Sequence, residues 1–373
     1  MPDAGARTVL LTGATGFVGR ELLWRLARVP GQQIVCLVRA ANQAEADRRV
    51  ADLLARARPS PLPPDASARV EAIPSDLSAD RLGLDAGRWD RLATRPFRVV
   101  HCAATVNWAL PLDAARATNV LGTRRVLDLA SVAARAGVLE RFDYVSTCNV
   151  CGRRPGLVAE EDLDDRHGFF NAYEQSKFEA ERLVRSSGLP VMTFRLSMVV
   201  GDSRTGETAK FDGPYLVLRM MDRLPSPGVF FRIGGGSGTV NVVPVDFVVD
   251  ALTALAATSE SRGRTYHLCD PQPHSPAELV AMFARATGRR FVFLPVPLWL
   301  ARACVAPPPV QRYLGLPPQA LDYFDDPVRH DTAQASCDLG ALGIACPRLA
   351  DYLPRLIDFY RARKDDVRTA AMV

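Results

Sequence analysis

The sequence predicts an α/β fold: a doubly wound parallel sheet followed by a smaller C-terminal lobe. Apolar strand patterns alternate with amphipathic helix patterns from residue 8 to about residue 200, an order typical of parallel strands joined by helical crossovers. A glycine turn joins the first strand to the first helix, and after Gly201 the pattern breaks into Pro- and Gly-rich segments. The chain of 373 residues also exceeds the usual size of a single hydrophobic core.

The first strand and helix flank the most informative segment, Thr-Gly-Ala-Thr-Gly-Phe-Val-Gly at residues 12–19. Strand, glycine turn and helix together are the context of a dinucleotide-binding fingerprint. Gly13 permits the tight turn, Gly16 lets the backbone approach a pyrophosphate, and Gly19 lets helix and strand pack closely. The Gly-x-x-Gly-x-x-Gly spacing resembles that of the extended short-chain dehydrogenase/reductase superfamily, which implies a Rossmann sheet. The cofactor-binding residues expected here are Gly13, Thr15, Gly16, Phe17, Val18 and Gly19.

The second strand, residues 33–38, ends in Arg39, twenty residues after Gly19. An NAD-specific fold usually places Asp or Glu there to bind the ribose 2′-hydroxyl. A guanidinium instead suits a 2′-phosphate, because it donates paired, charged hydrogen bonds. Arg39 therefore predicts NADPH as the cofactor. The alternative is that Arg39 is an ordinary solvated surface residue. Arginine is the usual basic residue of this chain, because only three of the 46 basic residues are lysine.

A tyrosine and one of these rare lysines lie four residues apart in the helical pattern of residues 170–187. Tyr173 and Lys177 therefore share one helix face. A phenol with its usual pKa near 10 is a poor proton donor and acceptor at neutral pH, and a nearby ammonium lowers that pKa. We expect Tyr173 to transfer the proton, and Lys177 to tune it and to hold a cofactor ribose. The alternative is an exposed pair on an ordinary helix.

A third catalytic group is expected as a hydroxyl at the end of the fifth strand, in the run 142–152. In the extended superfamily this hydroxyl lies three residues before the Val of a Val-Tyr-Gly-like turn. Here the turn is Val-Cys-Gly at residues 150–152, so the resemblance selects Thr147, with Ser146 as the second candidate. Cys151 replaces the tyrosine of that turn.

Further segments resemble one branch of the superfamily, the thioester reductases and fatty acyl-CoA reductases. They are residues 37–40, 76–78, 98–108, 119–123 and 195–206. The resemblance covers about residues 7–210 well and 240–252 less closely. It implies that Asp76 and Leu77 lie at the adenine, that Ala103 and Ala104 line the nicotinamide side, and that Asn119 belongs to the catalytic set.

The resemblance implies an NADPH-dependent reductase of an acyl thioester, either a fatty acyl-CoA or an acyl group on a carrier protein. The product is an aldehyde, or an alcohol after a second hydride. One alternative is a ketone or hydroxysteroid oxidoreductase, and another is a sugar-nucleotide epimerase or dehydratase, against which Arg39 and Cys151 count. A non-catalytic cofactor sensor is the third, but such proteins usually lack the Tyr/Lys pair.

Charge and cysteine content indicate which classes of partner and ligand the protein can bind. The net charge is +5 without a Lys/Arg-rich tract, which argues against nucleic-acid binding, although a basic face would suit an acidic carrier protein. The eight cysteines show no paired metal-ligand spacing, so no metal site is expected. The N-terminus lacks the pattern of a signal peptide, which predicts a cytoplasmic protein. Oligomeric state is left open.

Residues 1–205, with 239–268 returning to them, are expected to form the NADP-binding domain. Residues 206–238 and 269–373 form the substrate-binding lobe, with helices at 275–288 and 347–364 and a flexible loop at 233–238. The apolar segment 291–306 is too short to span a membrane. It predicts core or lid packing, or else an apolar helix that contacts a membrane peripherally or guards a lipid entrance. Candidate pocket residues are Phe211, Pro214, Tyr215, Trp299 and Tyr313.

Overall fold

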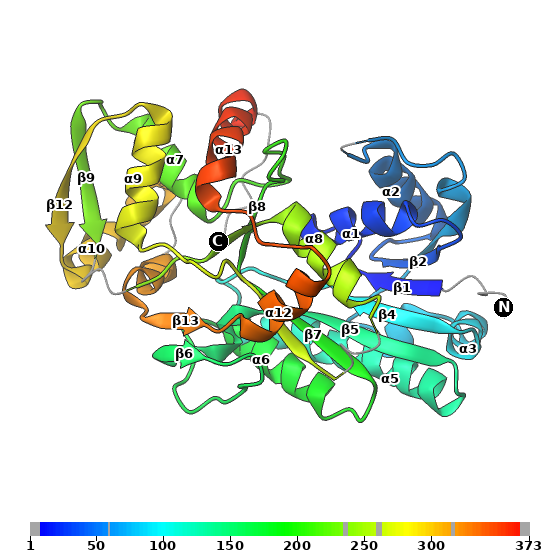
Figure 1. The fold of residues 1–373 in the computed structure, drawn as a ribbon. Coiled ribbons are helices and arrows are strands. Elements are labelled where there is room, and N and C mark those ends of the chain that lie inside the picture. Colours follow the sequence, from blue (N-terminus) through cyan, green and yellow to red (C-terminus); the bar gives the residue numbers. More distant parts are fainter. Residues whose placement is uncertain (1–7, 59, 234–237, 259–262, 315–317, 366–373) are drawn as a thin grey trace.

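A seven-stranded parallel sheet organises the chain (Figure 1), which confirms the predicted fold class. The computed structural model describes residues 8–58, 60–233, 238–258, 263–314 and 318–365. The strand order is β11-β7-β5-β4-β1-β2-β3. In chain order these strands are β1 (Thr8–Thr12), β2 (Gln33–Val38), β3 (Val70–Pro74), β4 (Phe97–His101), β5 (Leu139–Thr147), β7 (Val191–Leu196) and β11 (Thr265–Leu268).

Helices cover both faces of this sheet, as a doubly wound fold requires. One face packs against α1 (Phe17–Ala27), α2 (Gln43–Ala55) and α8 (Val245–Leu255), and the other against α3 (Ala86–Thr94), α5 (Gly122–Arg135) and α6 (Ala172–Arg185). Side-chain caps set several helix starts, since Asn42, Asp85 and Asn171 each accept a hydrogen bond from a backbone N–H three residues on.

The helical region between β4 and β5 is interrupted. It consists of α4 (Leu112–Arg116), a π-helical turn η3 (Ala117–Leu121) and α5. The Asn119 amide is hydrogen-bonded to both backbone groups of Thr105, which holds this turn against the loop after β4. Such π-turns are frequent at functional sites.

The C-terminal lobe is built on a second core, at the left of Figure 1. A parallel pair of strands, β9 (Gly228–Ile233) and β12 (Phe291–Val296), lies at its outer edge. Its helices are α7 (Pro214–Arg223), α9 (Pro276–Thr287), α10 (Leu298–Val305), α11 (Pro308–Leu314) and α13 (Leu349–Arg363). The expected helices at 275–288 and 347–364 correspond to α9 and α13. Of the expected loop at 233–238, residues 234–237 lie outside the described part of the chain.

Short strand pairs join the lobe to the sheet. β8 (Met198–Val200) pairs with β10 (Val242–Pro244), and β6 (Gly156–Val158) pairs with β13 (Val328–His330). The chain then returns to the sheet through α8 and β11. Short helical turns η1 (Ser67–Arg69), η2 (Asp80–Gly83), η4 (Cys148–Cys151) and η5 (Pro318–Asp325) complete the elements.

Two details differ from the sequence-based expectations. Helix α12 (Ala333–Ala341), counted with the lobe, packs on the sheet body, because Ala335 and Leu339 join the core of α1 and α8. The apolar segment 291–306 is not one helix but strand β12 followed by α10, separated at Pro297. Within the described residues, no helix combines the length and apolar character needed to cross a membrane.

Candidate active site

A cavity of about 620 Å³ opens at the carboxyl ends of the central strands. Its walls come from the glycine turn after β1, the loop after β4, the end of β5, helix α6 and the β7–β8 segment. Strand β1 lies between β2 and β4, so the strand order reverses beside the glycine turn. Open α/β sheets bind ligands at such a switch point.

The glycine turn is shaped for a pyrophosphate. Gly13 has a φ of +76°, and a Cβ on Gly19 would lie 2.0 Å from the Gly13 carbonyl oxygen. Helix α1 starts after Gly16 without a side-chain cap and without an acidic residue in its first turn. Its first N–H groups can therefore bind an anion. Gly16, Phe17, Val18 and Gly19 line the cavity, while Thr15 is exposed beside the turn.

The residues expected at the adenine end follow β2 and β3. Arg39 is exposed at the end of β2. Asp76 accepts hydrogen bonds from the Ser78 hydroxyl (2.6 Å) and N–H (2.8 Å), and these bonds, with the charges of Arg39 and Arg125, lower the pKa of Asp76. The Leu77 carbonyl accepts a hydrogen bond from Arg125 at 3.0 Å.

The two alanines after β4 lie against the glycine turn. The N–H of Ala103 donates to the Thr12 hydroxyl at 3.2 Å, and a Cβ on Gly13 would lie 2.7 Å from the Ala103 nitrogen. Ala104 is exposed and lines the cavity. A dinucleotide therefore fits along this edge, with the close backbone approach that the glycines allow.

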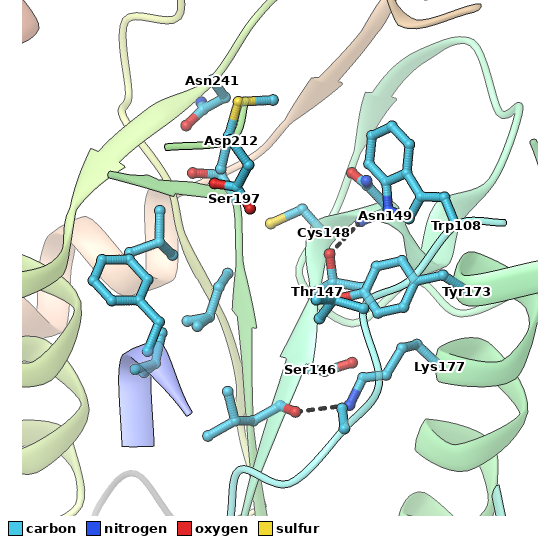
Figure 2. A pocket seen from close by; sticks show the side chains of 18 of the residues that line it. Trp108, Ser146, Thr147, Cys148, Asn149, Tyr173, Lys177, Ser197, Asp212 and Asn241 are labelled. Atoms are coloured by element: carbon cyan, nitrogen blue, oxygen red, sulfur yellow. Dashed lines mark hydrogen bonds between the residues drawn. The ribbon is translucent and has the colours of Figure 1, made fainter. Parts of the chain in front are cut away.

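Thr147, Tyr173 and Lys177 all line the same cavity. Figure 2 shows the three side chains on one wall, across from Ser197 and Asp212. Thr147 ends β5, and its hydroxyl accepts a hydrogen bond from the Asn149 N–H at 3.3 Å. The neighbouring Ser146 hydroxyl donates to the buried Glu181 carboxylate at 2.6 Å. This bond holds the Ser146 hydroxyl toward α6, so the geometry favours Thr147 over Ser146.

The ionisation of the Tyr/Lys pair differs from the simple expectation. Burial raises the pKa of Tyr173 to about 12, although a hydrogen bond with Thr147 opposes this rise. The Lys177 ammonium donates to the Tyr144 hydroxyl (2.7 Å) and the Val145 carbonyl (2.9 Å), and burial lowers its pKa to about 8. The expected lowering of the Tyr173 pKa is therefore wrong for this state, because burial raises it and the Lys177 ammonium donates instead to Tyr144 and Val145 of β5. Tyr173 is protonated at neutral pH.

A family model described as "Male sterility protein" matches residues 11–252. The chain belongs to this family. Family and relatives identify it as an oxidoreductase of the extended short-chain dehydrogenase/reductase type that binds a nicotinamide cofactor.

Two curated relatives of this family member are much longer proteins. The chain is 33% identical over 298 residues to a carboxylic acid reductase of Mycobacterium marinum, covering 71% of this chain and 24% of that protein. It is 32% identical over 285 residues to a linear gramicidin synthase of Brevibacillus parabrevis, covering 74% of this chain and 5% of that protein. The chain thus spans a quarter or less of these relatives.

Among solved structures, the terminal R domain of the myxalamid PKS-NRPS pathway shares 30% identity with a TM-score of 0.81, and 97% of this chain and 92% of that chain are covered. A UDP-glucuronic acid 4-epimerase from Bacillus cereus shares 19% identity with a TM-score of 0.63, over 98% of this chain and 100% of that chain. The second likeness shows the fold alone.

Asn119 lies behind the cavity of this family member and is buried. Its amide oxygen accepts the Thr105 N–H (2.8 Å), and its amide nitrogen donates to the Ser176 hydroxyl (2.9 Å). It thereby joins the loop after β4 to helix α6, which carries Tyr173 and Lys177.

Sequence reasoning missed several residues in and around the cavity. Lys210 lines the cavity and forms an ion pair with Asp212; the rarity of lysine could have singled it out. Tyr144, which receives the Lys177 hydrogen bond, lies three residues before Thr147 in β5. Tyr323 reaches the cavity from the C-terminal lobe, and no motif signals it.

A second cavity of about 460 Å³ adjoins the first and is almost wholly apolar. Trp108, Met198, Val240 and Tyr323 line both cavities. The other walls come from α7, β9, α9, β12 and α10.

The five residues expected from the sequence to line the substrate pocket do not all lie in one cavity. Pro214 lines the apolar cavity, whereas Phe211 and Tyr215 are buried in the lobe core. Trp299 is 68% exposed and lines neither cavity. The side chain of Tyr313 lies outside the described part of the chain. Across the described residues, no group of three His, Cys, Asp or Glu side chains is arranged to hold a metal ion.

Proposed function

We propose that this protein uses NADPH to reduce an acyl thioester, a fatty acyl-CoA or a carrier-bound acyl group, to an aldehyde. The observation that carries the proposal is the meeting of three features in one place. The glycine turn and the Thr147, Tyr173 and Lys177 side chains line one cavity, and an apolar cavity adjoins it. Likeness to a carboxylic acid reductase and to the R domain of the myxalamid pathway supports the same substrate class.

The chain offers a fitting set of residues for NADPH. The N-terminus of α1 would hold the pyrophosphate, and Arg39 the 2′-phosphate. Asp76 and Leu77 lie where the adenine end would rest, and Ala103 and Ala104 where the nicotinamide side would pass. Lys177 would donate a hydrogen bond to the ribose. When bound, NADPH supplies the hydride that the acyl carbon receives.

The side chains of the site act on the carbonyl oxygen. Thr147 and Tyr173 donate hydrogen bonds to it, which stabilises the negative charge that develops there. The proton then moves from the Tyr173 hydroxyl to this oxygen, and the raised pKa of Tyr173 ensures that the proton is present at neutral pH. Collapse of the resulting hemithioacetal breaks the carbon–sulfur bond, and the free thiol leaves with a proton.

Three residues position this set. Asn119 holds the loop after β4 against α6 through Thr105 and Ser176, so we assign it a supporting part in the catalytic group. The Lys177 ammonium is held by Tyr144 and Val145. The apolar cavity, lined in part by β12 and α10 from the segment 291–306, would receive the lipophilic part of the acyl group.

The test is a substrate panel with purified protein, followed by NADPH absorbance. It contains long-chain acyl-CoAs, the matching aldehydes, a 3-ketosteroid and UDP-glucose, with NADH as the control. Oxidation with acyl-CoA and release of free thiol supports the proposal, and further oxidation with the aldehyde indicates an alcohol product. Activity on the ketone alone would assign the same residues to carbonyl reduction instead.

A further inference from the structure

Helix α6 is tied to the C-terminal lobe beside its catalytic tyrosine. The tie is Tyr323, from the helical turn η5. Its hydroxyl donates a hydrogen bond to the Glu174 carboxylate and accepts one from the Asn171 side-chain amide at 2.8 Å. Glu174 directly follows Tyr173 in the sequence, and Asn171 is the N-cap of α6.

Glu174 is a buried carboxylate, only 1% exposed. A buried carboxylate is costly unless it is hydrogen-bonded. Its partners are the Tyr323 hydroxyl and the Phe170 N–H, which donates to it at 2.9 Å. Asn171 in turn accepts the Glu174 N–H at 3.1 Å. The first turn of α6 is thus held by a connected network of hydrogen bonds, in which the Tyr323 hydroxyl is the donor from the lobe.

This local arrangement matters because Tyr173 is the second residue of α6. The first-turn N–H groups of a helix have no partners within the helix, and helix ends fray. The direction of the Tyr173 side chain therefore depends on how firmly the first turn is held.

The ring of Tyr323 faces the route of the substrate. Its centroid lies 5.0 Å from that of Trp108 and 5.2 Å from that of Phe170. Tyr323 and Trp108 both line the catalytic cavity and the apolar cavity. Tyr323 therefore stands where the two cavities meet, and it holds the catalytic helix at the same time.

We propose that Tyr323 is a positioning residue for the reduction: through Glu174 it fixes the first turn of α6, and with it the Tyr173 hydroxyl against Thr147. The proposal rests on the proposed function for its activity assay. It assigns the lobe a part in catalysis besides enclosing the substrate.

The charges around Glu174 give the proposal a pH signature. Burial raises the pKa of Glu174 to about 7, and the charge of Asp326 also raises it. Three effects lower this pKa: the Tyr323 hydrogen bond, the Phe170 N–H and the Arg153 charge. Tyr173 and Cys151 are the other titratable neighbours, and the Glu174 charge raises the pKa of each. Ionised Glu174 accepts a stronger hydrogen bond than its neutral form. The tie therefore weakens, and activity falls, as the pH drops through this pKa.

The decisive variant is Tyr323→Phe, which keeps the ring contacts and removes only the hydroxyl. We expect kcat to fall about tenfold, the size of a lost hydrogen bond to a charged group, with KM within about twofold. The low-pH limb of kcat should disappear, because no Tyr323–Glu174 hydrogen bond remains whose strength depends on the Glu174 charge. Glu174→Gln should abolish that limb, and the double variant should be no worse than the poorer single variant.

Tyr352→Phe is the matched control. It removes another buried lobe hydroxyl, 3.5 Å from the Val242 carbonyl and remote from α6, and should leave kcat and its pH profile unchanged. An unchanged kcat and pH limb in Tyr323→Phe would overturn the proposal, and so would fully additive losses in the double variant. Should Tyr323→Phe not fold, Glu174→Gln alone decides, because a low-pH limb retained in that variant contradicts the proposal.

The pH dependence of protein stability is a second readout, and it needs no substrate. It therefore distinguishes failure of the Tyr323 proposal from failure of the proposed function. The folded pKa of Glu174, about 7, lies above its ordinary 4.5. Its contribution to stability is then full below about pH 4.5 and is lost as the pH rises through 7. In unfolding measurements across pH, Tyr323→Phe should extend this loss to higher pH and Glu174→Gln should remove it. If the unsubstituted protein reduces no thioester but these shifts in stability are present, the proposed function is rejected, whereas the hydrogen bond from Tyr323 to Glu174 is supported.

Discussion

At the scale of single residues, the site depends on which protonation state each group is held in. Burial keeps Tyr173 protonated, which suits a group that gives its proton to a developing oxyanion. Burial also lowers the pKa of Lys177, but two acceptors from β5 hold its ammonium. The sequence could predict these residues from their spacing, but not their pKa values, because burial depends on the whole fold.

Tyr173→Phe removes the proton donor and leaves the ring in place. We expect turnover to fall by about 10²- to 10⁴-fold, the usual contribution of general acid catalysis, while NADPH binding persists. Steady-state kinetics and NADPH fluorescence titration measure the two effects. A variant with full activity contradicts the mechanism.

Arg39→Glu reverses the charge at the end of β2. Because the carboxylate repels a 2′-phosphate and can accept a hydrogen bond from a ribose hydroxyl, NADPH binding should weaken far more than NADH binding. Calorimetry with both cofactors measures the ratio. Equal weakening would show that Arg39 does not read the phosphate.

At the scale of elements, the sequence predicted the helices, strands and turns that depend on neighbouring residues, but not those formed by contacts between distant segments. Strand β2 spans Gln33–Val38 as expected, and β1 and the glycine turn follow their apolar run and spacing. The short pairs β8–β10 and β6–β13 were not expected, because each joins three-residue segments far apart in the chain. The π-turn at Asn119 was missed for the same reason, since Thr105 holds it from another loop.

Gly19→Ala tests the close packing of α1 on the turn. The new Cβ would lie 2.0 Å from the Gly13 carbonyl oxygen, so the helix must shift and NADPH binding should be lost. Gly340→Ala, in helix α12 with no atom within 4 Å of its added Cβ, is the matched control. It should bind NADPH normally and gain about 0.5–1 kcal/mol of stability, because Ala favours helices over Gly. Normal binding by Gly19→Ala would refute this role of the glycine.

At the scale of the whole molecule, function arises where the sheet body and the lobe meet. The glycine turn and the Thr147, Tyr173 and Lys177 set come from the sheet body, while Tyr323 and the apolar cavity come largely from the lobe. Motifs predicted the first group because cofactor chemistry demands particular residue types at fixed spacing. The second group has no such spacing, since any apolar side chains of suitable size form an apolar wall.

Val217→Phe, on α7, adds bulk inside the apolar cavity. Long-chain thioesters should lose kcat/KM by about fourfold for each methylene displaced into water, because a buried methylene contributes about 0.8 kcal/mol. Short-chain thioesters should react as before. A chain-length series gives the result, and a uniform loss at every length would contradict a chain-binding role for this cavity.

Reduction of a thioester by NADPH is tested most directly by counting the products of the reaction. NADPH oxidised and thiol released are measured together with a long-chain acyl-CoA. We expect one thiol for each NADPH when the aldehyde is the product, or one for every two NADPH when the alcohol forms. NADPH oxidation without any thiol release, or oxidation only with ketones, would contradict this expectation.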